Sequence, residues 1–150
     1  MKSLRIPLIK SGMVIDHISA GNAVKVLQIL QIPEKLTAIV SVAMNVQGKL
    51  GKKDIVKIEN RELAREEVDK IALIAPKATI NIIRDYKVVE KHRVELPDEL
   101  IGIAKCPNPT CVSNFKEPAP GRFLVIDKDI PRIKCYYCER EPEDILDKII

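Results

Sequence analysis

Aromatic residues are scarce in this 150-residue chain, which has no tryptophan, two phenylalanines and three tyrosines. Proteins that read single-stranded RNA usually stack its bases on aromatic side chains, so this scarcity argues against that class. Long apolar runs are also missing, because none reaches the roughly 18 residues that a membrane-spanning helix needs. The first residues lack the charged-then-apolar order of a signal peptide. We therefore expect a cytoplasmic protein that binds neither membranes nor nucleic acid.

Catalytic motifs are missing as well. The sequence contains no Ser-His-Asp arrangement, no glycine-rich phosphate loop and no pair of acids in a metal-binding context. The two histidines, His17 and His92, lie in different settings and suggest no proton relay. A stand-alone enzyme is therefore the least favoured class of function.

Cysteine occurs only four times, and all four residues lie between positions 106 and 138. They form a C-x4-C pair and a C-x2-C pair separated by 23 residues: Cys106, Cys111, Cys135 and Cys138. This spacing is typical of a four-thiolate zinc site. Two disulfides are the alternative, which a reducing cytoplasm disfavours. Four thiolates complete a tetrahedron and leave no position for water, so the sequence predicts one structural Zn²⁺.

Charge is unevenly distributed along the chain. Residues 1–97 carry 17 Lys and Arg against 11 Asp and Glu, whereas residues 98–150 carry 8 against 10. A zinc ion held by four thiolates adds two further negative charges to the second segment. Zinc ribbons that bind nucleic acid need a basic face, which this segment does not offer. We therefore expect two domains, 1–97 and 98–150, with any anion-binding site in the first.

The order of predicted elements indicates an α+β fold. An edge segment over residues 4–10 precedes strands at 13–18, 37–46, 54–59, 78–83 and 86–95, with helices near 20–31 and 60–75. Ser19 and Asn60 are the expected N-caps of the two helices. Without the edge segment and the last strand, this is the ferredoxin-like order, an antiparallel sheet with both helices on one face.

The second segment is predicted to be rich in β-structure. Residues 96–104 read as a connecting turn, and short strands are expected near 121–127 and 132–135. Apolar residues within 143–150 can form one helical stripe.

Charged residues on the predicted strands suggest a basic site for a small anion such as a nucleotide. Lysines can bind phosphates, and a carboxylate can accept hydrogen bonds from ribose hydroxyls. The candidates are Asp16, His17, Lys57, Glu59, Tyr86 and Lys91. Solvated charges on an exposed face are the alternative interpretation. In a regular strand Asp16 and His17 face opposite sides, so both reach one ligand only at a strand end or a bulge.

Several segments together resemble the regulatory chain of aspartate carbamoyltransferase. They are residues 14–18, 51–60, 75–81 and 106–111 with 135–138, in the same order from about residue 10 to residue 140. The resemblance implies a non-catalytic subunit of pyrimidine biosynthesis. It also implies that the N-terminal domain binds ATP or CTP and pairs with its own copy, while the zinc domain joins catalytic trimers through the catalytic chain. A zinc-ribbon accessory protein associated with nucleic acid is the alternative.

The resemblance also assigns roles to individual residues. Asp16 would hold ribose hydroxyls, His17 would lie near the phosphates, and Lys57 and Lys91 would carry most of the phosphate and ribose contacts. The base pocket would be lined by Ile9, Asn81, Ile83, Tyr86 and Val88. The zinc ligands would be the four cysteines.

Overall fold

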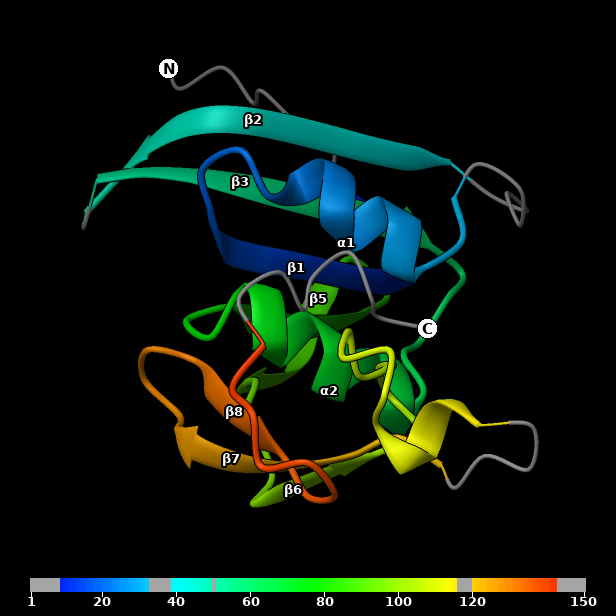
Figure 1. Cartoon of the computed structure of the whole chain (residues 1–150). Coiled ribbons are helices and arrows are strands. Elements are labelled where there is room, and N and C mark those ends of the chain that lie inside the picture. Colours follow the sequence, from blue (N-terminus) through cyan, green and yellow to red (C-terminus); the bar gives the residue numbers. More distant parts are fainter. Residues whose placement is uncertain (1–8, 33–38, 50, 116–119, 143–150) are drawn as a thin grey trace.

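A computed structural model describes residues 9–32, 39–49, 51–115 and 120–142 (Figure 1). Its larger sheet has the strand order β2-β3-β1-β4-β5, and all neighbouring strands run antiparallel. The strands are β1 (Gly12–Ser19), β2 (Val40–Gly48), β3 (Gly51–Glu59), β4 (Thr79–Arg84) and β5 (Lys87–Arg93). Helix α1 (Ala23–Ile29) follows β1, and helix α2 (Arg65–Ile74) follows β3. This arrangement confirms the predicted α+β class and its ferredoxin-like order with one strand more.

The hydrophobic core lies between the sheet and the two helices. Alternate residues of the central strands point toward the helices, and Met13, Ile15 and Val56 are fully buried there. Val26 of α1 and Ile71 of α2 are buried against them. The intervening side chains of the same strands point to the opposite face, which neither helix covers. Several of the predicted polar site residues lie on that second face.

Both helices begin later than the sequence predicted. Helix α1 has Asn22 rather than Ser19 at its N-cap, and α2 has Ala64 rather than Asn60. Asn60 adopts a left-handed conformation with φ of 56°, which ends β3 in a turn. The backbone N–H of Ala64 donates to Glu67 Oε1 at 3.1 Å, so the start of α2 is held by a side chain within its own first turn.

The second unit is built around a smaller antiparallel sheet with the order β6-β7-β8. Its strands are β6 (Glu99–Ile101), β7 (Arg122–Asp127) and β8 (Arg132–Cys135), and a 3-10 turn spans Val112–Asn114. The two later strands confirm the prediction. The connecting turn expected over 96–104 is wrong in part, because residues 99–101 pair with β7. Residues 4–8 of the edge segment and the helical stripe at 143–150 lie outside the described residues.

The core of this unit is small. Phe123 is fully buried, and Leu100 and Ile133 are buried beside it. Gly121 allows the close approach of a neighbouring segment, because a Cβ atom there would lie 2.1 Å from the carbonyl oxygen of Ala104. No helix in the described part of the chain is long and apolar enough to cross a membrane.

Candidate functional site

The four cysteines come together at one end of the β6-β7-β8 unit. Their sulfur atoms all lie within 4.8 Å of one another. Cys106 Sγ is 3.7 Å from Cys138 Sγ, and Cys111 Sγ is 3.7 Å from Cys135 Sγ. Tetrahedral bonds of about 2.3 Å to a central zinc ion require sulfur–sulfur distances of about 3.8 Å. None of the four cysteines forms a disulfide. The cluster therefore fits a closed four-thiolate metal site and not the disulfide alternative.

Hydrogen bonds fix the two cysteine loops. The amide of Asn114 donates from Nδ2 to the carbonyl oxygens of Cys106 and Asn108, at 2.8 and 2.9 Å, and so closes the first loop. Strand β8 delivers Cys135, whose backbone N–H donates to the carbonyl oxygen of Arg140 at 2.9 Å across the second loop. Both pairs are thus held in place by contacts outside the sulfur atoms themselves.

The surroundings act differently on the individual thiols. Burial raises the pKa of Cys106 to about 12 and also raises the pKa of Cys135. Burial opposes ionisation of Cys138 too, but hydrogen bonds from the backbone of Arg140 and the side chain of Asn108 outweigh it and lower its pKa to about 7. A metal ion supplies the positive charge that four clustered thiolates need.

The uncovered face of the larger sheet carries a row of side chains that crosses all five strands. The register pairs Ser41 with Lys57, Lys57 with Val14, Val14 with Asn81, and Asn81 with Lys91. Three of the predicted site residues therefore share one row, although they lie on three different strands. Lys57 is partly desolvated in this row, and burial lowers its pKa.

A bulge brings Asp16 and His17 to the same side of β1. The β1–β3 register shifts between Ile15 and Ile18, and His17 has a left-handed φ of 59°. The imidazole Nδ1 lies 3.9 Å from Asp16 Oδ2 and 3.0 Å from Thr79 Oγ1. A bulge is one of the two arrangements, beside a strand end, in which both side chains could reach one ligand.

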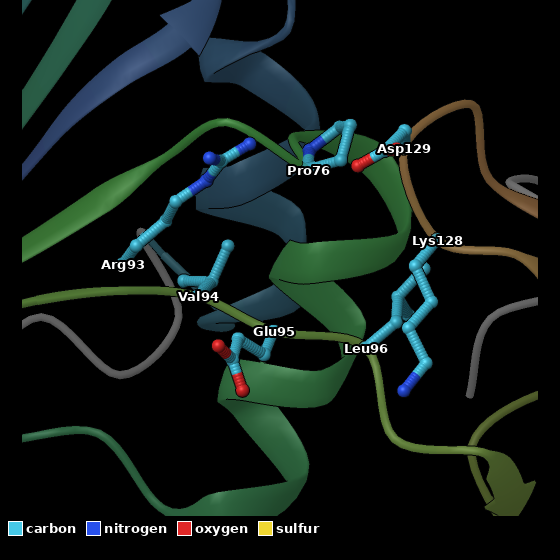
Figure 2. Close-up of a pocket in the computed structure, with 7 residues that line it drawn as sticks. All are labelled: Pro76, Arg93, Val94, Glu95, Leu96, Lys128 and Asp129. Carbon is cyan, nitrogen blue, oxygen red and sulfur yellow. The ribbon is translucent and has the colours of Figure 1, made fainter.

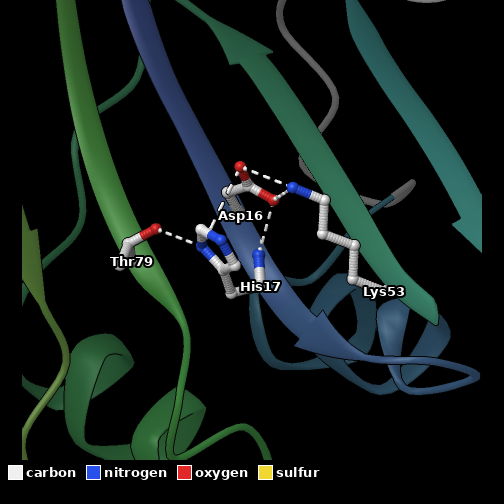
Figure 3. A network of polar contacts seen from close by, with 4 residues as sticks. All are labelled: Asp16, His17, Lys53 and Thr79. Carbon is white, nitrogen blue, oxygen red and sulfur yellow. Dashed lines mark hydrogen bonds and ion pairs between the residues drawn. The ribbon is translucent and has the colours of Figure 1, made fainter. Parts of the chain in front are cut away.

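Lys53 belongs to the same group of side chains, although the sequence analysis did not select it. Its ammonium lies 2.9 Å from Asp16 Oδ1 and forms an ion pair with it (Figure 3). The sequence spacing could have identified Lys53, because Lys53 and Lys57 are four residues apart on one strand and so share a face.

The residues expected to line a base pocket lie beside this row, at the β4–β5 end of the sheet. Ile83 pairs with Val88, two residues beyond Asn81 and past a shift of register after Ile82. Tyr86 lies in the tight turn between the two strands, and its backbone N–H donates to the carbonyl oxygen of Lys10 at 3.0 Å. That bond brings the segment containing buried Ile9 to the same turn.

A cavity of about 270 Å³ lies where the two units meet (Figure 2). It is lined by Pro76, Arg93, Val94, Glu95, Leu96, Lys128 and Asp129. Two cationic and two acidic side chains border it, so its charge favours neither an anion nor a cation. Lys128 also lies 2.9 Å from Asp98, at the start of the second unit.

Comparisons with known proteins match both parts of the chain. Residues 4–95 match the family model described as aspartate carbamoyltransferase regulatory chain, allosteric domain, and residues 98–145 match the metal binding domain of the same chain. A relative of that name from Methanothrix thermoacetophila is 55% identical over 140 residues, which cover 93% of this chain and 91% of the relative. One from Methanothermobacter thermautotrophicus is 56% identical, covering 91% and 88%. One from Pyrococcus furiosus is 53% identical, covering 97% and 98%.

An allosteric part followed by a metal-binding part defines a regulatory, non-catalytic subunit, and the four clustered cysteines lie within the part that matches the metal binding domain. The chain belongs to the family of aspartate carbamoyltransferase regulatory chains. Its partner is accordingly the catalytic chain of that enzyme.

Proposed function

We propose that the uncovered sheet face binds ATP or CTP as competing effectors. The observation that carries this proposal is the cross-strand row of Lys57, Asn81 and Lys91, flanked by the Asp16–His17 bulge. Lysines supply charge for phosphates, and Asp16 supplies an acceptor for ribose hydroxyls. Ile9, Ile83, Tyr86 and Val88 would contact the base.

The spacing of the two lysines suits an elongated ligand. Lys57 and Lys91 are separated by three strand spacings, which is about 14 Å between their backbones. Each lysine has a long flexible stem, so both ammonium groups can turn inward toward one nucleotide. Asn81 lies between them and offers an amide that can recognise a base edge.

The N-terminal unit also offers a surface for pairing with a second copy. Strand β2 is an edge strand of the sheet, and Val42 and Met44 on it are 39% and 48% exposed. Ile39, just before the strand, and Val24 of α1 are also exposed apolar residues. An unpaired strand edge with apolar side chains favours association with another strand. This supports a homodimer formed through the allosteric unit.

The remaining parts of the proposal concern the second unit. We assign zinc to the four-cysteine site because four thiolates in a tetrahedron suit that ion, and the ion would have a purely structural role. The unit would join catalytic trimers by contacting the catalytic chain. The division at residues 97 and 98, and a cytoplasmic location, belong to the same proposal.

Calorimetric titration with CTP and then ATP tests the effector site. We expect saturable, mutually competitive binding at about one site per chain. Lys57→Ala should weaken binding of both nucleotides by about tenfold or more, because a charge-assisted phosphate contact is lost. Lys52→Ala is the matched control, since Lys52 is the exposed neighbour of Lys53 on the same strand. Unchanged nucleotide affinity in Lys57→Ala would reject the site. An oligonucleotide added at moderate salt should not bind.

A further inference from the structure

Asp16 and Lys53 form an ion pair with each other on the uncovered sheet face. The Lys53 ammonium lies 2.9 Å from Asp16 Oδ1 and 3.2 Å from Oδ2, so it contacts both carboxylate oxygens. The two side chains are only 21% and 23% exposed. This burial distinguishes the pair from an ordinary surface ion pair, which solvent would screen almost completely.

The rest of the surroundings leave little acceptor capacity on the carboxylate. The backbone N–H of His17 donates to Asp16 Oδ1 at 2.6 Å, and the imidazole of His17 lies 3.9 Å from Oδ2 (Figure 3). A pair of ribose hydroxyls that donates to both oxygens of Asp16 must therefore compete with the ammonium of Lys53.

The stem of Lys53 passes close to Gly48 at the end of β2. A Cβ atom at Gly48 would lie 3.1 Å from Cδ of Lys53 and 3.3 Å from its Cε. Glycine at this position thus leaves room for the lysine stem to lie along the strand toward Asp16.

We propose that Lys53 makes the site selective for ligands that carry phosphates. Its ammonium occupies the Asp16 carboxylate, which would bind ribose, unless phosphates of the ligand bind that ammonium instead. We call this arrangement the selectivity gate. This inference rests on the proposed nucleotide site. A nucleoside triphosphate can exchange partners: its ribose hydroxyls replace Lys53 on Asp16, and its phosphates receive Lys53 in turn. A nucleoside offers no anion, so it would leave a half-buried ammonium without its acceptor.

The gate predicts that one substitution changes two affinities in opposite directions. Lys53→Met keeps the length of the side chain but removes the ammonium. We expect it to weaken CTP and ATP binding by about tenfold or more, and to strengthen cytidine and adenosine binding by about threefold to tenfold. Lys53→Arg keeps the charge and should retain the wild-type preference. Lys52→Met is the matched control and should change neither affinity.

Competition calorimetry with both nucleosides and both triphosphates, on the full zinc-loaded chain, measures these affinities. Lys53→Gln is measured beside Lys53→Met, and thermal unfolding selects the variant that remains folded. If the triphosphates weaken but the nucleosides do not strengthen, Lys53 is a simple phosphate contact and the gate is rejected. Equal weakening of both ligands would indicate a structural role and would reject it too. If the wild-type chain binds no triphosphate, the proposed function fails, and the gate fails with it.

Discussion

The two units of this chain are stabilised by different means. The first packs two helices on a five-stranded sheet and supplies most of the Ile, Val, Leu and Met side chains of one buried cluster that extends into the second unit. The second has a three-stranded sheet and adds few large apolar residues to that cluster, of which Phe123 is the most voluminous. So small a core leaves little net stability after the cost of ordering the chain. We therefore expect metal coordination to take the place of hydrophobic burial in the second unit.

Loss of a metal ligand should therefore have the largest effect on folding, and this effect should be confined to the second unit. We expect Cys135→Ala to unfold the second unit and to abolish assembly with the catalytic chain, because small zinc modules derive about 10 kcal/mol or more from their metal. The first unit should stay folded. Hydrogen exchange resolved along the chain, together with sedimentation of a mixture with catalytic trimers, measures both effects.

Metal removal provides the matching control. A chelator that strips the wild-type chain should reproduce the exchange pattern of Cys135→Ala, and added zinc should restore the protected state of the wild type alone. An assembled complex formed by the Cys135→Ala chain would contradict this account of the second unit.

A buried carboxylate stabilises the first unit, although its loss should cost less stability than the loss of a metal ligand. Asp54 is completely buried on β3 and accepts backbone N–H bonds from Gly21 at 2.8 Å, Ala23 at 3.0 Å and Asn45 at 2.8 Å. It thereby holds the start of α1 and the bulge in β2. Asp54→Asn retains the shape but replaces one acceptor by a donor that faces backbone donors. We expect the free energy of unfolding to fall by about 2–4 kcal/mol.

Urea unfolding of the zinc-loaded chain measures that loss. Asp69→Asn is the control, because Asp69 is a partly buried acid on α2 whose pKa is raised by burial. Removing its charge should cost little stability. Zinc content should stay at one ion per chain in both variants, since neither residue belongs to the second unit. A drop in zinc content in Asp54→Asn would show that the two units depend on each other more than the comparison implies.

The same contrast explains what the sequence could predict. Strand order follows from local alternation and turn residues, and the metal site follows from cysteine spacing, so both were accessible. The start of α1 was not, because the backbone N–H of Ala23 there donates to Asp54 on β3, which is 31 residues away in sequence. Strand β6 was missed for a similar reason, since three residues become a strand only by pairing with β7.

The polar face of the sheet could be predicted from the sequence only in part. Its lysines were recognisable as charged residues on strands, but a single row that joins Lys57 to Lys91 depends on the register of four strands. The ion pair of Lys53 with Asp16 depends in addition on the bulge at His17. A bulge of this kind requires a left-handed φ at a histidine, which no local sequence rule demands.

The smallest expected effect is a proton linkage at the proposed effector site of the first unit. Burial lowers the pKa of Lys57 below its ordinary value of 10.5. A bound phosphate would counteract that burial and raise the pKa again, so the complex binds protons more tightly than the free chain does. Nucleotide binding should then take up protons at alkaline pH. Affinity should fall as the pH rises from the lowered pKa toward the ordinary one.

Titrations in two buffers with different ionisation enthalpies, at neutral and at alkaline pH, measure this uptake directly. We expect a fraction of a proton per nucleotide at alkaline pH and less at neutral pH, where Lys57 is charged before and after binding. Lys57→Arg keeps the positive charge on a group that does not titrate in this range, so it should bind nucleotide without the pH-dependent uptake. Equal uptake in the arginine variant would assign the proton to another group of the site. It would also show that the proposed effector site uses the charge of Lys57 but not its titration.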